Sequence, residues 1–287
     1  MPLSLYETVV GEIIARSKDA ETPMLGLGAA AEEAEYRSVL WESYVRTISD
    51  VDRLWADGER GQKKLLEIGS FLGTVSFSLK KLGYDVTALD IPEFHEVEQS
   101  RLTYQQNGVD YFGVNLRNGK LPFGSSVFDA VIACEVFEHF NFNPLPVLAE
   151  VNRILKDGGW FYLAMPNQAH LRSRIKAMLG KSVRDPVSTY FKQLDRKENK
   201  IVAIHWREYT LPETVEMVTS MGFEVTKKYY FSERETFKFP NSKLMRELYR
   251  LCKSAALAVP SFKRTQVVIA RKTHSPSYDF WFTEANS

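Results

Sequence analysis

The stretch LLEIGSFLGT, residues 65–74, decides the fold of this chain. A short, mostly apolar run is followed by Gly69 and Gly73, and a segment with helical character begins directly after them, over 75–82. A strand that turns through glycines into a helix is typical of the first unit of an open α/β sheet. In such sheets a ligand binds beyond the carboxyl ends of the strands, and glycines are expected to let the backbone approach it.

Strands and helices alternate after this turn. The predicted strands are the apolar runs 65–68, 85–89, 111–114, 128–133, 160–164, 223–231 and 266–270. A helix before the fifth strand is indicated by apolar residues at helical spacing over 147–155, and Gly158 and Gly159 are expected to end it. The fold class is therefore α/β: a Rossmann-like sheet of seven mostly parallel strands with helices on both faces.

The segments around the sheet define the expected domain organisation. Residues 1–58 are predicted to form an N-terminal helical extension, residues 59–272 the main domain, and residues 273–287 a C-terminal tail. Within the main domain, residues 168–204 are basic and show no strong period, which suggests a lid-like insertion after the fifth strand. Residues 241–258 have apolar positions at helical spacing and are predicted to form an inserted helix. The sequence Thr210-Leu211-Pro212-Glu213 reads as a capping box that starts another helix.

Composition excludes several classes of protein. The formal net charge of +1 over 287 residues gives no electrostatic argument for binding nucleic acid. No stretch approaches the roughly 20 apolar residues of a membrane span, and the first residues lack the pattern of a signal peptide. Cys134 and Cys252 are far apart and have no metal spacing. We expect a cytoplasmic protein, for which peripheral membrane contact is disfavoured; its oligomeric state is not predicted.

The residues of the glycine turn select the class of ligand. A dinucleotide fingerprint requires a glycine where this chain has Phe71. Glu67 would lie beside a pyrophosphate, whereas a carboxylate suits the ammonium and sulfonium of S-adenosylmethionine (SAM) better. Asp90 ends the second strand 21 residues after Gly69, about where a carboxylate binds ribose hydroxyls. An ordinary structural turn with two glycines is the alternative.

Taken together, the motifs resemble a known family. The succession consists of LLEIGSFLG (65–73), VTALD (86–90), VNLRNGKLPF (114–123), FDAVIACEVFEHF (128–140) and RILKDGGWFYLAMPN (153–167). Its order and spacing are similar to those of the class I SAM-dependent methyltransferases, above all the group that includes the ubiquinone-biosynthesis methyltransferases. The resemblance covers about residues 64–167 and implies SAM as the cofactor.

The resemblance also implies a set of cofactor-binding residues. They are Glu67, Gly69, Ser70, Phe71, Gly73, Asp90, Ile91, Asn115, Leu116, Cys134 and Glu135. Glu67 and the glycines would hold the methionine end, Asp90 the ribose, and Asn115 with Leu116 the adenine. Phe71 replaces the usual middle glycine, and either narrows the pocket or packs on a helix. Asn115 replaces the usual aspartate but keeps an acceptor oxygen.

Two chemistries are open for the residues after the fourth strand. His139 is a candidate general base, because histidine titrates near neutral pH, and the neighbouring carboxylates are expected to raise its pKa. The alternative is a site for Mg²⁺ or Mn²⁺ formed by Glu135, Glu138, His139 and His205, since carboxylates and imidazoles suit such ions. The small-RNA 3′-end methyltransferases and some ubiquinone-pathway O-methyltransferases are similar here and use a metal.

The segment HWREYT, residues 205–210, is the candidate for contact with the methyl acceptor. Its residues His205, Arg207 and Tyr209 follow the insertion and are expected to return to the crevice, and similar segments occur in methyltransferases of sugar and polysaccharide pathways. The alternative is structural: Arg207 pairs with Glu208 on the surface, and Tyr209 packs in front of the next helix.

These observations predict a SAM-dependent methyltransferase that methylates an oxygen of a small molecule or of a sugar or polysaccharide. N-methylation of a small amine, metal-dependent RNA 2′-O-methylation and SAM binding without catalysis are the alternatives. The net charge disfavours the RNA enzyme, and His139 disfavours a protein that only binds SAM. The identity of the acceptor is not readable from the sequence.

Overall fold

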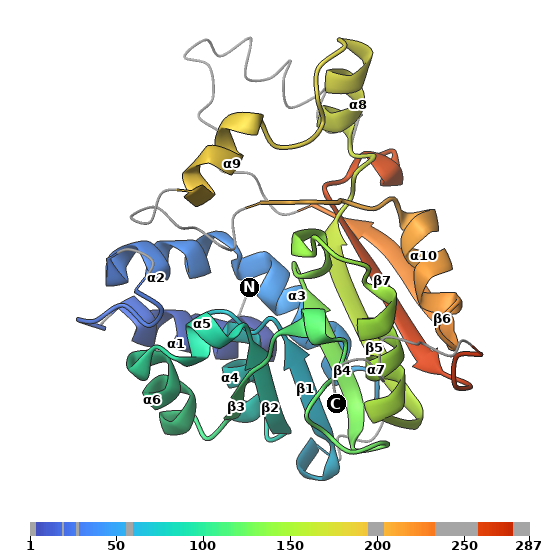
Figure 1. Ribbon diagram of the computed structural model, residues 1–287. Coiled ribbons are helices and arrows are strands. Elements are labelled where there is room, and N and C mark those ends of the chain that lie inside the picture. Colours follow the sequence, from blue (N-terminus) through green and yellow to red (C-terminus); the bar gives the residue numbers. More distant parts are fainter. Residues whose placement is uncertain are drawn as a thin grey trace.

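A computed structural model describes residues 4–18, 20–26, 29–55, 60–194, 204–232 and 258–277. At its centre lies a seven-stranded sheet with the order β3-β2-β1-β4-β5-β7-β6 (Figure 1). The strands are β1 (Lys64–Ile68), β2 (Asp85–Asp90), β3 (Asp110–Gly113), β4 (Phe128–Cys134), β5 (Leu155–Pro166), β6 (Phe223–Phe231) and β7 (Thr265–Lys272). β7 pairs antiparallel with both β5 and β6, and the other pairs of neighbouring strands are parallel. The predicted Rossmann-like, mostly parallel sheet is confirmed.

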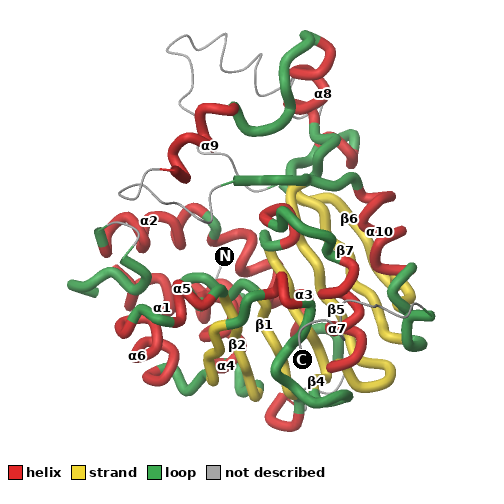
Figure 2. Tube along the Cα trace, in the orientation of Figure 1, coloured by secondary structure: helices red, strands yellow, loops and turns green. Residues whose placement is uncertain are grey.

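Helices cover both faces of this sheet. They are α1 (Leu5–Lys18), α2 (Ala30–Val39), α3 (Trp41–Asp52), α4 (Thr74–Lys81), α5 (Pro92–His95), α6 (Glu98–Gln106), α7 (Leu145–Ile154), α8 (Leu171–Met178), α9 (Val187–Leu194) and α10 (Leu211–Thr219). Figure 2 shows α7 and α10 in front of the strand layer and α1 and α4 on its other side. Among the described helices, none is long and apolar enough to cross a membrane.

Alternation along the strands produces two hydrophobic cores. In β1, Leu65 belongs to the core on one face, whereas Leu66 and Ile68 belong to the core on the other. The first core also contains buried side chains of the N-terminal helices: Val9, Val10, Ile13, Ile14, Ile48 and Val51. The second is closed by α7 and α10. The N-terminal helices therefore pack into the same core as the central strands.

The boundary between α7 and β5 differs from the prediction. The helix ends at Ile154 and the strand starts at Leu155, so the two glycines expected to end the helix lie inside the strand. Gly158 has a φ of +73°, and a Cβ on Gly159 would lie 2.8 Å from the carbonyl oxygen of Lys156. These glycines accommodate an irregularity, visible as a shift of register between β4 and β5. A strand can thus begin directly where the helix stops.

Outside the sheet, the structure differs from the sequence predictions for some segments and agrees for others. No helix was predicted over residues 168–204, but α8 and α9 form there. The helices α5 and α6, after β2, were not predicted. The predicted helix over 241–258, apart from its last residue, and the tail beyond residue 277 lie outside the described residues. The predicted capping box is confirmed: Thr210 and Glu213 cap the start of α10 reciprocally.

Candidate functional site

The carboxyl ends of β1 and β2 are joined directly at the glycine turn. The backbone N–H groups of Gly69 and Ser70 donate to the carbonyl oxygen of Leu89, at 2.9 and 3.1 Å. Because β1 lies between β2 and β4, the residues that end these three strands meet at one edge of the sheet. The predicted residues of the turn, of β2 and of β4 therefore belong to one site.

Glu67 is a buried carboxyl group in the middle of this site. Its Oε2 accepts a hydrogen bond from the backbone N–H of Ser76 at 2.9 Å and another from the Ser76 hydroxyl. Burial raises the pKa of Glu67 to about 8, against the opposing effect of the Ser76 hydrogen bonds; the negative charge of Asp90 adds to the rise. In the free protein this group therefore holds its proton at neutral pH.

Asp90 fixes the shape of the turn. Its carboxylate accepts the backbone N–H groups of Phe71 at 2.6 Å and of Ile91 at 2.7 Å. Burial raises the pKa of Asp90 to about 6, although these hydrogen bonds lower it. Phe71 has a φ of +46°, in the left-handed region, and its ring packs against Tyr36 and Phe94 with centroid distances of 5.4 and 5.6 Å. Of the two expectations for Phe71, the structure supports packing on helices, here α2 and α5.

The glycines of the turn are required by the packing around them. Both adopt positive φ, +70° at Gly69 and +72° at Gly73. A Cβ on Gly69 would lie 2.3 Å from Cγ2 of Val136, and one on Gly73 would lie 2.3 Å from Cζ of Phe77. Neighbouring side chains already fill the space that a side chain would need. The glycines therefore allow close packing of the turn against α4 and against the segment that follows β4.

The remaining predicted cofactor residues surround the turn. Asn115 is exposed and caps a short 3-10 turn that begins at Leu116, where its side chain accepts the N–H of Arg117 at 3.1 Å. Cys134 ends β4, and burial raises the pKa of its thiol to about 12, so the thiol is neutral. Glu135 follows with a φ of +56°, which turns the chain sharply out of the strand.

Sequence reasoning missed Arg46, a cation on α3 beside this edge of the sheet. Its Nε and Nη1 atoms are buried and have no hydrogen-bond partner. The guanidinium lies 4.5 Å from the ring centroid of Phe231 and interacts electrostatically with Cys134 and Glu135. An orphaned, buried guanidinium is costly unless an anion pairs with it. The available signal in the sequence was a single arginine among the apolar positions of a predicted helix.

A second cluster is built where the chain leaves β4. The backbone carbonyl of Glu138 accepts the N–H groups of Trp206 and Arg207, at 2.8 and 3.2 Å, so two segments far apart in the sequence are held together. His139 Nδ1 lies 2.9 Å from the carbonyl oxygen of Ile204. A carbonyl can only accept, so Nδ1 carries the proton and Nε2 is the nitrogen left free to accept one.

His205 is oriented in the same way. Its Nδ1 bonds to Oε1 of Glu208 at 2.9 Å, and its ring lies 4.9 Å from the ring of His139. One ligand atom each from Glu138, His139 and His205 lie within 4.8 Å of one another. The group does not include Glu135. Both carboxyl oxygens of Glu138 are buried without a hydrogen-bond partner.

The protonation states in this cluster differ from expectation. The pKa of His139 is lowered, by burial first and by neighbouring His205 second, although its carboxylate neighbours were expected to raise it. Burial and the charge of Glu135 also hold the pKa of Glu138 well above its usual value. For His205, burial lowers the pKa, but the hydrogen bond and charge of Glu208 outweigh it and the net shift is upward.

Arg207 and Tyr209, the other two residues predicted to contact the acceptor, are both held by other parts of the protein. Arg207 is exposed and pairs with Glu213 at 3.2 Å, rather than with Glu208, whose carboxylate is engaged by His205. Tyr209 is buried in the core that α7 and α10 close. Its carbonyl oxygen accepts from the Gln266 side chain at 2.7 Å. Of the segment 205–210, the structure thus brings only His205 into the histidine cluster.

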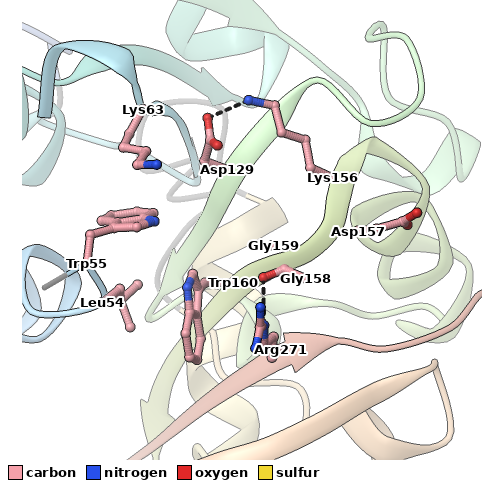
Figure 3. A pocket seen from close by; sticks show the side chains of 10 residues that line it. All are labelled: Leu54, Trp55, Lys63, Asp129, Lys156, Asp157, Gly158, Gly159, Trp160 and Arg271. Atoms are coloured by element: carbon pink, nitrogen blue, oxygen red, sulfur yellow. Dashed lines mark hydrogen bonds and ion pairs between the residues drawn. The ribbon is translucent and has the colours of Figure 1, made fainter. Parts of the chain in front are cut away.

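A cavity of about 380 Å³ lies at the opposite edge of the sheet. Figure 3 shows it between Trp55 and Trp160, with Lys63, Asp129 and Arg271 at its walls. These residues lie at the amino ends of β1, β4 and β5 or at the carboxyl end of antiparallel β7. Ligands of open α/β sheets bind at the carboxyl ends of the parallel strands, so this cavity is separate from the candidate site.

Comparison with known proteins agrees with this geometry. Residues 66–163 match a family model described as a methyltransferase domain. A ubiquinone biosynthesis O-methyltransferase of Pseudomonas aeruginosa (strain UCBPP-PA14) is 29% identical over 136 residues, which cover 44% of this chain and 56% of that protein. The corresponding enzyme of Thiobacillus denitrificans is 28% identical over 120 residues, 41% of this chain and 50% of that protein. The matches thus span about half the length of these relatives.

Solved structures share the fold. A SAM-dependent methyltransferase from Mesorhizobium loti has a TM-score of 0.50 at 18% identity and covers 82% of this chain and 98% of its own. The [4+2]-cyclase SpnF has a TM-score of 0.53 at 17% identity, with coverage of 81% and 82%. The same architecture therefore occurs in a protein described as a cyclase, which means that the reaction must be argued from the site.

Proposed function

We propose that this chain is a class I SAM-dependent methyltransferase that transfers the methyl group of SAM to an oxygen of a small molecule, because residues 66–163 match a methyltransferase domain and the two relatives described above are O-methyltransferases. One observation carries the proposal: the glycine turn, Glu67 and Asp90 converge at the carboxyl edge of the sheet, as a SAM site requires. SAM supplies a methyl group on a positively charged sulfur. The protein must position the two reactants and exclude water.

The residues present fit SAM by their chemistry. Asp90, once ionised, offers acceptor oxygens to ribose hydroxyls, and Glu67 offers a buried carboxyl group to the ammonium. Arg46 provides the complementary charge, because its unpaired Nε and Nη1 suit a carboxylate such as that of the methionine end. Asn115 and Leu116 remain the residues proposed for the adenine. Buried groups without partners in the free protein thus find them when the ligand binds.

Ligand-dependent stability tests the cofactor. SAM or its demethylated product should raise the thermal midpoint of the purified protein, as any ligand of the native state does. Asp90→Asn should weaken this effect by about tenfold in affinity or more, because ribose hydroxyls lose a charged acceptor. Asp85→Asn is the matched control, since Asp85 starts the same strand at the opposite edge. Stabilisation by NADH and not by SAM would overturn the proposal.

The small-molecule acceptor rests on the relatives. Two of them act in ubiquinone biosynthesis as O-methyltransferases, and this supports an oxygen of a small molecule as the acceptor. A sugar acceptor, N-methylation, RNA methylation and binding without catalysis stay alternatives. Methyl transfer from labelled SAM to pools of metabolites, glycans and RNA separates them, because each pool gives a product of its own class.

For the histidine cluster we propose a divalent ion, Mg²⁺ or Mn²⁺, as the second candidate. The supporting observation is that both histidines have Nδ1 engaged, which leaves Nε2 available beside the unpartnered carboxyl oxygens of Glu138. Outer partners that orient imidazole ligands in this way are typical of metal sites. His139 as a general base is the competing interpretation, because the same Nε2 can accept a proton.

Binding of Mn²⁺ to the free protein, followed by the paramagnetic signal of the unbound ion, separates the two. A metal site predicts binding that His205→Ala and Glu138→Gln abolish and that Glu208→Gln weakens about tenfold or more. His170→Ala is the control, since His170 bonds to Ser173 outside the cluster. Full methyl transfer in the presence of a chelator, with loss of activity in His139→Ala, would leave the general base.

A further inference from the structure

The cavity at the amino edge of the sheet has a lining that the proposed methyl transfer does not use. Its volume of about 380 Å³ falls within the roughly 300–1,000 Å³ of pockets that hold small molecules. Its described lining combines two tryptophans, three cations and two acids. Because the catalytic ligands of open α/β sheets lie at the other edge, these side chains are available for a different ligand.

The two acids of the lining are paired with cations of the protein. Asp129 accepts hydrogen bonds from Nζ of Lys156 and from the backbone N–H of Lys64, both at 2.8 Å. Asp157 lies 3.4 Å from the buried ammonium of Lys272, and its side chain is 97% exposed. Figure 3 shows Asp157 apart from both indoles. The described residues of the lining thus keep a net positive charge, which favours an anion as the occupant.

Arg271 is the cation best placed to bind that anion. It stands directly opposite Trp160 on the neighbouring strand, and its guanidinium lies 5.7 Å from the centroid of that indole. Its Nε donates to the carbonyl oxygen of Gly158 at 3.0 Å, which fixes the guanidinium on the irregular part of β5. It forms no ion pair with any described residue, including Glu224 directly opposite on β6. Its two terminal nitrogens can therefore bind two oxygens of one carboxylate or phosphate.

Two indoles give the cavity flat apolar walls. Trp55 follows α3, and its ring lies 5.8 Å from the ring of Tyr84 and 5.9 Å from Nζ of Lys63. Trp55 and Trp160 both pack against the hydrophobic core and are only partly buried, so each keeps exposed ring surface. Figure 3 shows the two rings at the same end of the cavity. Indoles of this kind stack on planar rings, so they favour an aromatic over an aliphatic anion.

We propose that this cavity binds a planar aromatic molecule that carries a carboxylate or a phosphate. The ring packs against the indoles of Trp55 and Trp160, and the anionic group binds the guanidinium of Arg271. The site lies at the opposite edge of the sheet from the proposed SAM site, so both ligands can be bound at once. The proposal does not depend on the assignment of methyl transfer.

Calorimetric titration of the full-length protein with 1-naphthyl phosphate and with 1-naphthoate tests the proposal. Wild-type protein should bind at least one of these probes, and the tighter of the two identifies the preferred anionic group. Neutral 1-naphthol and inorganic phosphate should each bind at least about tenfold more weakly, because each offers only half of the interaction.

Variants of the lining identify where the probe binds. Arg271→Gln should lower the affinity about tenfold, and Arg271→Lys less, because lysine keeps the charge but not the planar fork. Trp160→Leu should lower it about fivefold or more through lost stacking. The matched controls are Lys228→Gln, an exposed cation on β6, and Trp206→Leu, an indole at the carboxyl edge of the sheet. Both controls should bind the probe like wild type.

Three results would overturn the proposal. These are affinity for the neutral analogue equal to that for the probes, unchanged affinity in the Arg271 and Trp160 variants, and displacement of the probe by the demethylated product of SAM. Failure of the proposed function is distinguishable, because it appears as absent SAM binding in a separate titration. Circular dichroism should show an unchanged melting midpoint for both Arg271 variants, since this side chain is exposed, so they decide the question even where Trp160→Leu is destabilised.

Discussion

At the scale of single residues, the candidate site is a set of buried groups that lack their final partners. Glu67 and Glu138 have pKa values raised by burial, and Arg46 has two unpaired nitrogen atoms. Perturbed and unsatisfied groups concentrated at one place are typical of binding sites, since a ligand supplies the missing partners.

Glu67 leads to a prediction about protons. A cation placed beside this carboxyl group favours its ionised form, so SAM binding at pH 7 should release close to one proton per ligand. Calorimetry in buffers with different ionisation heats measures this number. Glu67→Gln cannot ionise and should bind SAM without the release. A wild-type value near zero at pH 7 would mean that Glu67 stays protonated beside the ligand.

Glu67 also makes the stability of the free protein depend on pH. Its pKa is raised from 4.5 to about 8 on folding, so the folded protein binds more protons than the unfolded chain between these values. Stability from this group is therefore fully present below pH 4.5 and is lost as the pH rises through 8. The free energy of unfolding should decline more steeply with pH in wild type than in Glu67→Gln, as measured by urea denaturation. Parallel pH profiles of the two proteins would contradict this.

At the scale of elements, one side chain anchors the junction after β5. Asn167 is fully buried, and its amide nitrogen donates to the carbonyl oxygens of Ser261 and Lys263, both at 2.9 Å. Its side-chain oxygen accepts the N–H of Ala169 at 3.1 Å. The segment that leads into α8 therefore begins at a point fixed to the turn that precedes β7. Three hydrogen bonds from one residue set where the sheet ends and α8 begins.

Asn167→Asp should destabilise the protein strongly. The substitution keeps the shape but places a carboxylate against two carbonyl oxygens, which costs about 3 kcal/mol or more when buried. Urea denaturation measures the loss. Asn143→Asp is the control, because Asn143 is partly exposed and uses only its side-chain oxygen, as acceptor for the N–H of Leu145. Equal stability of the two variants would show that the junction is not anchored as described.

At the scale of the whole molecule, the N-terminal helices are part of the fold rather than an attachment to it. Side chains of α1, of α3 and of the segment before α2 are buried in the same core as β1, β2 and α4. Val10, Ile48 and Val51 have no exposed surface at all. A chain without these helices would expose the part of this core that they cover.

Deletion of residues 1–59 should therefore prevent cooperative folding. Eight buried apolar side chains precede residue 60, and each contributes roughly 1.5–3 kcal/mol. Their sum is comparable to the 5–15 kcal/mol by which a typical domain is stable. Urea denaturation should show no sigmoidal transition for the truncated chain, and the dye ANS should bind to the uncovered core. A single sharp transition with the wild-type dependence on urea would contradict the prediction.

Local sequence was sufficient for the sheet and for the glycine turn. Alternation of apolar runs with helical stripes predicted all seven strands, with ends displaced by at most a few residues for all but β5, and the resemblance pointed to SAM. These features are local because a buried parallel strand needs a continuous apolar run, and a turn at positive φ favours glycine. The helices α5 and α6 were not predicted, because α6 is polar over most of its length and α5 is a single turn.

Tertiary structure alone decided which partners each group has. The sequence identified Glu138, His139 and His205 as candidate ligands. Only the folded structure showed which ring nitrogen of each histidine is free, because His139 bonds to Ile204 and His205 bonds to Glu208. Burial reversed the expected shift of the pKa of His139 and left two guanidinium nitrogens of Arg46 without hydrogen-bond partners. A sequence by itself determines where apolar and polar residues fall along each element. Burial and charge pairing arise only when distant segments pack together, because solvent exclusion depends on all of them at once.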